Sequence, residues 1–195
     1  MRKSLVLASL FVLVCGGDAL AGVPDPLRSG IGASAAPLGC QYRFRPDGGL
    51  DTMTLCVTLR DGFTQPVAVC STSAVLGSPS LVVGDCSGLT QTGFTDSAGV
   101  VYFYYSCVTG RGDATVDVTA HCSGDIFIGG HTFSFTSTDL NNDGSGITDV
   151  VDLGVWAGGL STYIQFSDYT CNGTVDVVDL GVWAGGLTVD CGDCP

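Results

Sequence analysis

Oxygen-bearing side chains recur at alternate positions in residues 168–179, a spacing that suits a hard cation. Gly173 stands at the sixth position of this segment, where a tightly curled loop must turn sharply. Ca²⁺ takes about six to eight oxygen ligands, and alternate residues of such a loop can wrap them around one point. The candidate ligands, with Thr174 offering its main-chain carbonyl, are Asp168, Thr170, Asn172, Thr174, Asp176 and Asp179.

Another candidate calcium loop lies upstream of residues 168–179. We call it the first loop and residues 168–179 the second loop, and the register of the first loop has two interpretations. Residues 149–160 recur identically at 176–187, an offset of 27 positions, which starts the first loop at Asn141. The phrase Asp-Leu-Asn-Asn-Asp-Gly instead starts it at Asp139 and makes it two residues longer. The candidate ligands of the two registers together are Asp139, Asn141, Asp143, Ser145, Asp149 and Asp152, of which Asn141, Asp143 and Asp152 belong to both.

Each candidate loop leads into a short segment that has to position it. Twelve identities between residues 149–160 and 176–187 indicate a duplication. In both copies the apolar residues follow the i, i+3, i+4, i+7 spacing of a helix with one apolar face. The three glycines in each copy weaken a helix by about 1 kcal/mol apiece relative to alanine. We therefore expect calcium binding to help these helices fold.

The paired loops and helices of residues 138–188 resemble the type I dockerin domain, whose loops are EF-hand-like. The phrase at residues 139–144 and the repeated Val-Asp-Leu carry this resemblance. It implies a small α domain that holds Ca²⁺ and binds a cohesin-like or cell-surface protein through loop positions 10 and 11. Two other interpretations of those positions are an intramolecular core and contact with the preceding domain. The residues concerned are Val150, Val151, Val177 and Val178.

The composition narrows the possible functions. The chain has 195 residues and a formal net charge of −12, every acidic residue is Asp, and Lys3 is the sole lysine. Such a charge argues against binding to nucleic acid or to an anionic membrane surface, both of which need clustered Lys and Arg. Nine of the aspartates and no basic residue fall in residues 138–195. We therefore expect many of the aspartates to serve as cation ligands.

The N-terminus predicts export. Residues 1–21 combine a basic start, a ten-residue apolar stretch and the small-x-small sequence Ala19-Leu20-Ala21, as a secretory signal peptide does. We expect a secreted or extracellular protein, with the cell surface as a possible location and no membrane insertion. Residues 22–39, rich in Gly, Pro, Ala and Ser, predict a flexible leader.

Nine cysteines follow the signal peptide, and in an oxidising compartment they predict disulfides. Six lie within residues 40–122 and could form three bridges among themselves, with connectivity left open. For the other three, we expect a bridge from Cys171 to either Cys191 or Cys194.

Residues 40–137 alternate apolar and polar side chains, which predicts half-buried strands. Short strands with regular turns and no helical period indicate a β-sandwich of immunoglobulin-like (Ig-like) size. The predicted fold is mainly β, an Ig-like sandwich over residues 40–137 followed by the small α domain of residues 138–195. The strands are expected at 41–46, 52–60, 66–72, 80–84, 99–107, 114–122, 125–129 and 132–136.

Two phrases in this region resemble bacterial Ig-like domains of the invasin type. They are Thr-Leu-Arg-Asp-Gly-Phe-Thr-Gln-Pro-Val at residues 58–67 and Thr-Asp-Ser-Ala-Gly-Val-Val at residues 95–101. The resemblance supports the sandwich.

The sequence offers no assembled set of nucleophile, base and acid, so we expect a non-catalytic protein. The leading hypothesis is a secreted calcium-binding modular protein whose C-terminal domain mediates protein assembly or attachment to the cell surface. The alternative is a polysaccharide-binding or polysaccharide-degrading accessory module. The resemblance to dockerins implies this alternative, because dockerins are appendages of plant-cell-wall hydrolases. Tyr102 and Tyr104, which share one face of a predicted strand, could stack on sugar rings.

Overall fold

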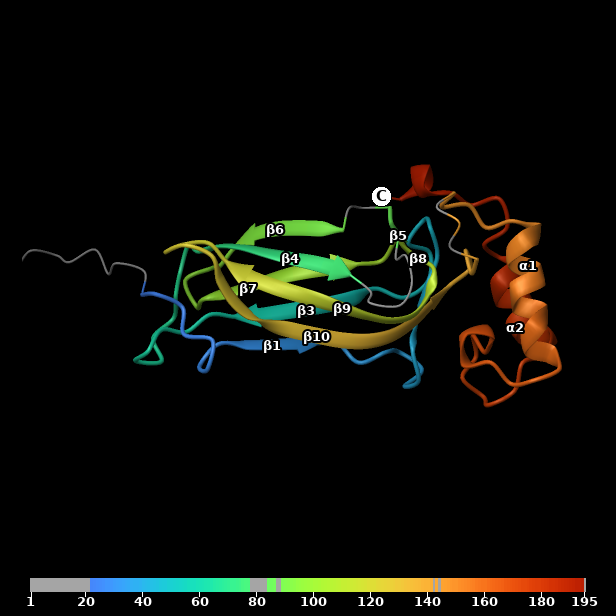
Figure 1. Cartoon of the computed structure of the whole chain (residues 1–195), viewed down its shortest axis with the longest axis horizontal. Coiled ribbons are helices and arrows are strands. Elements are labelled where there is room, and N and C mark those ends of the chain that lie inside the picture. The colour runs from blue at the N-terminus through green and yellow to red at the C-terminus, as the bar shows by residue number, and fades with distance from the viewer. Residues whose placement is uncertain (1–21, 78–83, 87–88, 142, 144, 195) are drawn as a thin grey trace, which may run out of the picture.

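The computed structural model describes residues 22–77, 84–86, 89–141, 143 and 145–194. The predicted signal peptide and most of the strand expected at 80–84 lie outside the described residues. Two β-sheets form an elongated body, and two short helices lie side by side at one end of it (Figure 1). No helix in the described part of the chain has the length and apolar run needed to span a bilayer.

The larger sheet has five strands and the smaller has three. The order in the larger sheet is β2 (Tyr42–Phe44), β10 (Ile126–Ser137), β9 (Arg111–Ala120), β4 (Ser71–Gly77) and β6 (Thr90–Phe94). The order in the smaller sheet is β1 (Gly30–Ala33), β3 (Met53–Thr58) and β7 (Val100–Tyr105). A short pair joins β5 (Gly84–Asp85) to β8 (Val108–Thr109). The pairings are antiparallel except that of β2 with β10, which is parallel.

The alternation in the sequence explains why these strands form a sandwich. In β3, the side chains of Met53, Leu55 and Val57 are fully buried, while the residues between them are only half-buried. Strands β7 and β9 alternate in the same way, so each sheet turns one apolar face towards the other. The prediction of a mainly β protein is confirmed.

Three sequence-based expectations about this region are wrong. Residues 22–39 are not simply a flexible leader, because β1 lies within them and pairs with β3, its Ile31 packing against the core. The strand expected at 66–72 begins only at Ser71, because the positive φ of Val69 (55°) breaks the extended backbone. The strands expected at 125–129 and 132–136 are one strand, β10, with a register shift between Phe127 and Gly129.

Both predicted helices are present. Helix α1 (Val150–Ala157) continues into the 3₁₀ turn η1 (Gly158–Leu160), and α2 (Val177–Ala184) is its repeat. Shorter 3₁₀ turns are η2 (Gln165–Ser167) and η3 (Cys191–Asp193). The buried face differs from the expected apolar stripe. In α1 it is formed by Asp152 and Trp156, whereas Val151 is 55% exposed.

The disulfide pattern also differs from expectation. The cysteines of the C-terminal region pair with those of the sandwich rather than with each other, because Cys171 precedes α2 and the other two follow it, each beside a different part of the sandwich. The four bridges are Cys40–Cys171, Cys86–Cys191, Cys107–Cys194 and Cys70–Cys122. Among the described residues, Cys56 is the free cysteine. Three covalent bonds thus join the two parts of the chain.

We predict that the described part of the chain contains a single alkylatable thiol, that of Cys56. Within this part, treatment with iodoacetamide in denaturant without reductant should modify Cys56 alone, because the other eight described cysteines are bridged. Peptide mapping of the unreduced digest should recover the four linked pairs. A peptide in which Cys171 is joined to Cys191 or Cys194 would contradict this arrangement.

Candidate metal centre

The second predicted loop, residues 168–179, is closed by the buried carboxylate at its first position. Asp168 is 1% exposed and accepts the main-chain N–H of Asn172 (3.2 Å) and of Gly173 (2.8 Å). Gly173 has a φ of +85°, a conformation that glycine adopts without steric cost. The loop therefore curls around its first carboxylate, as a cation-binding loop must.

A second buried carboxylate connects this loop to its helix. Asp179 accepts the main-chain N–H of Thr170 through Oδ1 and that of Asp176 through Oδ2, each at 2.9 Å. Asp176 is the N-cap of α2, and its own side chain accepts the N–H of Val178 at 2.8 Å. One aspartate thus holds both the start of the loop and the start of the helix.

The first loop shows the same pattern, and this settles where it begins. Asp152 accepts the main-chain N–H groups of Asn141 and Asp149, each at 2.8 Å. Asn141 therefore takes the place that Thr170 has in the second loop, which makes Asp139 the first position. The first loop therefore does not begin at Asn141, the start that the offset of 27 predicted.

The first loop has two residues more than the second loop, and these lie in its second half. Ser145 donates its N–H to Asp143 Oδ1 (2.8 Å), just as Thr174 donates to Asn172 Oδ1 (2.8 Å). The insertion therefore falls between Ser145 and Asp149. Within this stretch Ile147 forms a β-bridge with Asp190, so the added residues join the loop to the C-terminal tail.

Neutral oxygens complete the candidate ligand set of the second loop. The Thr170 hydroxyl lies 3.4 Å from Asp168 Oδ1. The Thr174 hydroxyl donates to Asn172 Oδ1 at 2.7 Å and lies 3.5 Å from Asp176 Oδ2. Hydrogen-bonding contacts thus join the side chains at loop positions 1 and 3. They also join position 7 to positions 5 and 9. In the first loop, Asn141 and Asp143 are similarly joined, by a bond of 3.1 Å.

The chemistry of this donor set fits calcium. The buried carboxylates of the two loops are Asp139, Asp152, Asp168 and Asp179. Burying a carboxylate is costly unless a positive charge compensates it, and residues 138–195 contain no Lys, Arg or His. Burial accordingly raises the pKa of Asp152 above its usual value. Within the described residues no three His, Cys, Asp or Glu side chains group as a metal cluster, so a cation here would depend also on amide, hydroxyl and main-chain oxygens.

The two loop–helix units cross over each other. Trp156 of α1 donates its indole N–H to the carbonyl of Ser167 (3.2 Å), the residue before the second loop. Trp183 of α2 donates to the carbonyl of Thr138 (3.1 Å), the residue before the first loop. Each helix therefore supports the loop of the other unit.

Small residues make this crossing possible. A Cβ on Gly159 would lie 2.8 Å from Cβ of Ser167, and one on Gly186 would overlap the side chain of Thr138. Gly158, the neighbour of Gly159, has nothing within 4 Å of the same position. Within each Gly-Gly pair of the repeat, the second glycine is needed for close approach between the units.

The sandwich holds the second loop through residues next to and within β2. Gln41 Nε2 donates to the carbonyls of Gln165 (2.9 Å) and Asp168 (3.2 Å). Arg43 donates to the carbonyl of Tyr169 (3.3 Å). The disulfide at loop position 4, Cys40–Cys171, lies beside these contacts. The loop that begins at Asp168 is therefore fixed to the sandwich from its start.

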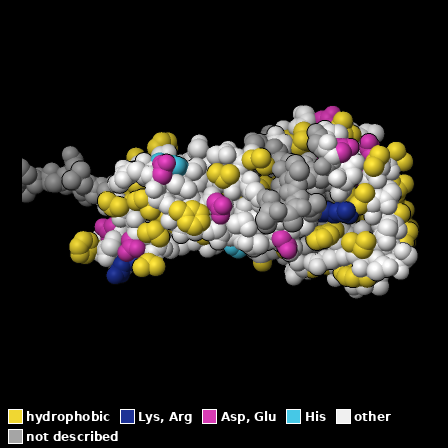
Figure 2. Space-filling view, viewed as in Figure 1, with side chains coloured by type: hydrophobic (Ala, Val, Ile, Leu, Met, Phe, Trp, Pro, Cys, Tyr) yellow, Lys and Arg dark blue, Asp and Glu magenta, His cyan; other side chains and the backbone are white. Residues whose placement is uncertain are grey.

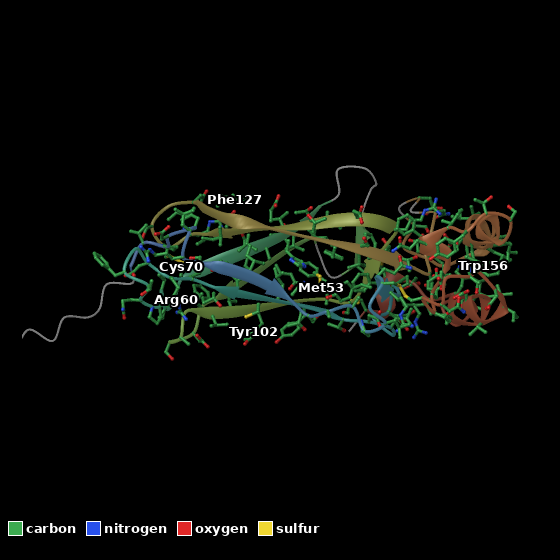
Figure 3. The ribbon with its side chains drawn as sticks, turned by 90° about the horizontal axis from the view of Figure 1, so that it is seen from below. Met53, Arg60, Cys70, Tyr102, Phe127 and Trp156 are labelled. Atoms are coloured by element: carbon green, nitrogen blue, oxygen red, sulfur yellow. A yellow bond between two sulfur atoms is a disulfide. The ribbon has the colours of Figure 1, made fainter. Side chains whose placement is uncertain are left out.

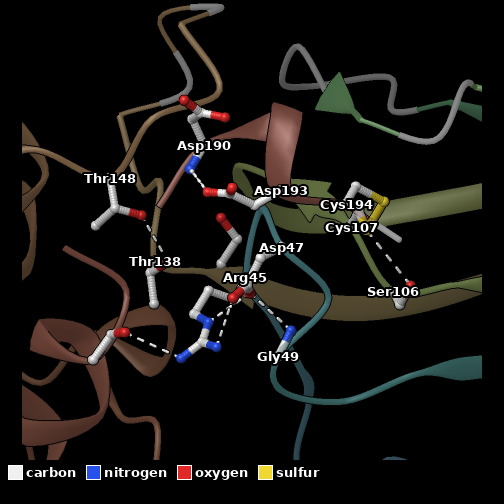
Figure 4. A network of polar contacts seen from close by, with 12 residues as sticks. Arg45, Asp47, Gly49, Ser106, Cys107, Thr138, Thr148, Asp190, Asp193 and Cys194 are labelled. Carbon is white, nitrogen blue, oxygen red and sulfur yellow. Dashed lines mark hydrogen bonds and ion pairs between the residues drawn. A yellow bond between two sulfur atoms is a disulfide. The ribbon is translucent and has the colours of Figure 1, made fainter. Parts of the chain in front are cut away.

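A second attachment reaches the end of α2 (Figure 4). Arg45 donates to the carbonyl of Gly185 (3.0 Å), where the helix leaves carbonyl groups without helical partners. Asp47 orients the guanidinium through two bonds of 2.6 and 2.7 Å. These hydrogen bonds lower the pKa of Asp47 and raise that of Arg45. Thr138 and Thr148 add a hydroxyl pair at 2.7 Å nearby.

The four valines of the predicted partner site lie at the surface. Val150, Val151, Val177 and Val178 are 74%, 55%, 76% and 56% exposed. They are therefore neither an intramolecular core nor a contact with the sandwich, and those two interpretations are wrong. Apolar side chains gather along the end of the molecule formed by the helices (Figure 2).

Sequence reasoning missed a chain of polar groups on the sandwich. Ser73 Oγ lies 2.8 Å from His121 Nε2, and His121 Nδ1 lies 2.7 Å from Asp125 Oδ1. Ser73 and His121 are 48 residues apart, so only strand pairing brings them together. Nothing in the sequence indicated which strand would lie beside His121.

No protein-family model matches this chain, and no curated protein matches it. Among solved structures, it is similar to the adhesin InvE of Yersinia pseudotuberculosis, with 18% identity and a TM-score of 0.38 over 60% of this chain and 28% of that one. It is also similar to the D00-D0 domain of Intimin, with 15% identity and a TM-score of 0.35 over 60% of this chain and 50% of that one. The chain thus spans half or less of each.

We predict that Gly159→Ala destabilises the protein by about 1–3 kcal/mol, because its methyl group overlaps Ser167. The matched control is Gly158→Ala. It should be neutral or stabilising by up to about 1 kcal/mol, because alanine fits its space and its helical φ of −56°. Denaturant unfolding of both variants measures the difference. Equal effects at the two positions would contradict the crossed packing.

Proposed function

We propose that this protein is a secreted, calcium-binding modular protein whose C-terminal unit binds a partner protein without a catalytic step. The observation that carries the proposal is the repeated closure of two loops on buried aspartates, Asp152 with Asp139 and Asp179 with Asp168, in a segment that has no basic residue. The four disulfides support an oxidising, extracellular location.

Ca²⁺ would supply the positive charge that these buried carboxylates lack within their own segment. Asp139, Asn141 and Asp143 would hold it in the first loop, with Ser145, Asp149 and Asp152 completing the set. In the second loop the ligands would be Asp168, Thr170, Asn172, Thr174, Asp176 and Asp179. The main-chain bonds to Asp152 and Asp179 support this assignment, because they tie the start of each loop to the carboxylate at its end.

The exposed valines support a docking role for this unit. Val150 and Val177 are the first residues of α1 and α2, and each is followed by a second exposed valine. Exposed apolar side chains of this kind are typical of surfaces that bind other proteins. By its resemblance to dockerins the patch would bind a cohesin-like or cell-surface protein. The three disulfides and the contacts of β2 indicate that the sandwich and the docking unit move as one body.

We predict that calcium raises the melting temperature of the full-length protein relative to chelator. A ligand at about a hundredfold excess over its Kd stabilises the folded state by about 2.7 kcal/mol, which for a chain of this size is about 5–10 °C. Asp139→Asn combined with Asp168→Asn should abolish most of this shift. Differential scanning calorimetry with calcium or EDTA, and calcium titration by calorimetry, provide the measurements.

The matched control for this experiment is Asp117→Asn. Asp117 is exposed on β9 of the sandwich and belongs to neither loop, so the calcium-dependent shift should persist. Identical melting of the unmodified protein in calcium and in EDTA, together with no heat of binding, would refute the calcium proposal.

A second candidate function places polysaccharide binding on the smaller sheet. Tyr102 and Tyr104 of β7 are 52% and 56% exposed and stand two residues apart, so both rings lie on the outer face. Gln91 exchanges two hydrogen bonds with the main chain of Tyr104, which fixes that end of the strand. Tyr102 lies opposite Cys56, and contact with this thiol raises the pKa of the phenol.

If this face binds sugar chains, Tyr102→Ala and Tyr104→Ala should each weaken the retardation of the protein in affinity electrophoresis on soluble polysaccharides. Loss of one stacked ring costs about 1 kcal/mol, or about fivefold in affinity. Phe127→Ala, which removes an equally exposed ring from β10 (58%), should leave the retardation unchanged. If the unmodified protein is not retarded at all, the proposal for this face is wrong.

A further inference from the structure

The outer face of the five-stranded sheet carries a hydrogen-bonded chain of three groups that the proposed calcium function does not use. Ser73 belongs to β4, His121 follows the end of β9, and Asp125 precedes the start of β10. Ser73 Oγ is 2.8 Å from His121 Nε2, and Asp125 Oδ1 is 2.7 Å from His121 Nδ1. A hydroxyl, an imidazole and a carboxylate are thus joined in that order.

The fold imposes this juxtaposition. Ser73 pairs with Thr119 across β4 and β9, and His121 lies two residues beyond Thr119, directly after the end of β9 and on the same face. The bridge Cys70–Cys122 continues this register and fixes the end of β9 next to β4. The turn into β10 then brings the Asp125 carboxylate to the far side of the imidazole ring.

The order of the three groups determines the direction of their hydrogen bonds. An ionised carboxylate can only accept, so Asp125 requires the proton of a neutral His121 to be on Nδ1. The unprotonated Nε2 must then accept, and the Ser73 hydroxyl donates to it. This is the arrangement in which a histidine withdraws a proton from a serine while a carboxylate orients the ring.

We propose that Ser73 is the nucleophile of an acyl-transfer site that accepts carboxylic esters with a small acyl group. Ser73 Oγ attacks the carbonyl carbon, and its proton passes to His121 Nε2. When the ester C–O bond breaks, that proton goes to the departing alcohol. Water then attacks the acyl-serine, gives its proton to the same nitrogen, and releases the carboxylic acid and the restored serine.

The surroundings of Ser73 limit what can react. The residue is 9% exposed and the His121 side chain is 33% exposed, so the hydroxyl lies low in the face and only a small acyl group reaches it. Thr92 and Thr119 pair with Ser73 from the two neighbouring strands. Their side chains share its face and flank the hydroxyl.

This site is independent of the calcium loops, and it would correct the expectation that the protein has no enzymatic activity. The test uses the full-length protein and a fluorophosphonate probe, which forms a covalent bond to an activated serine with loss of fluoride. We expect mass spectrometry to locate the adduct on Ser73. We also expect slow hydrolysis of p-nitrophenyl acetate, lowered at least tenfold in Ser73→Ala and in His121→Gln.

Ser71→Ala is the matched control, because Ser71 lies two residues away on the same strand and face. It should retain labelling and hydrolysis. Thermal unfolding of each variant checks that it is folded, and the site of the adduct on the unmodified protein tests the proposal without any variant. Absence of an adduct on Ser73, or hydrolysis equal to that of Ser73→Ala, would show that the three groups only brace the β9–β10 turn and would overturn the proposal.

Discussion

The C-terminal unit depends on two buried aspartates that each perform two structural tasks. Asp179 binds one N–H group at the start of its loop and one at the N-cap of its helix, and Asp152 repeats this in the other unit. A loop with this carboxylate cannot uncurl without also releasing the helix. The glycine-rich helices, which are too short to be stable in isolation, are therefore coupled to the loops that precede them.

The same unit also depends on the sandwich, which changes how the chain as a whole must be regarded. Trp156 and Trp183 are the large side chains that form its small core together with Leu140 and Tyr169. Such a core is too small to stabilise an independent domain. Three disulfides and the hydrogen bonds from residues in and beside β2 provide the rest. In the view from below, Trp156 lies among the helices at one end of the elongated molecule (Figure 3). Docking at the valines would thus place the whole sandwich in a fixed orientation.

Local signals predicted several of the strands and both α-helices, because each of these depends on a period of two or on a repeat visible within a dozen residues. Alternation located β3, β7 and β9, and the duplication located α1 and α2. Contacts between distant segments were not predictable in this way. The partner of Cys171 is 131 residues away, and the start of the first loop became clear only from the hydrogen bond between Asn141 and Asp152. The proximity of Ser73 and His121 likewise follows from strand pairing alone.

The distribution of charged residues differs between the C-terminal unit and the sandwich. Residues 138–195 have nine aspartates and no cation, yet Arg43 and Arg45 of the sandwich reach them only through main-chain carbonyls. Each arginine is meanwhile paired with an aspartate of its own region, Asp51 or Asp47. The two arginines that attach the sandwich to the unit are thus each paired with a carboxylate outside it. This pairing supports the proposal that an external divalent ion is the counter-charge of the loop carboxylates.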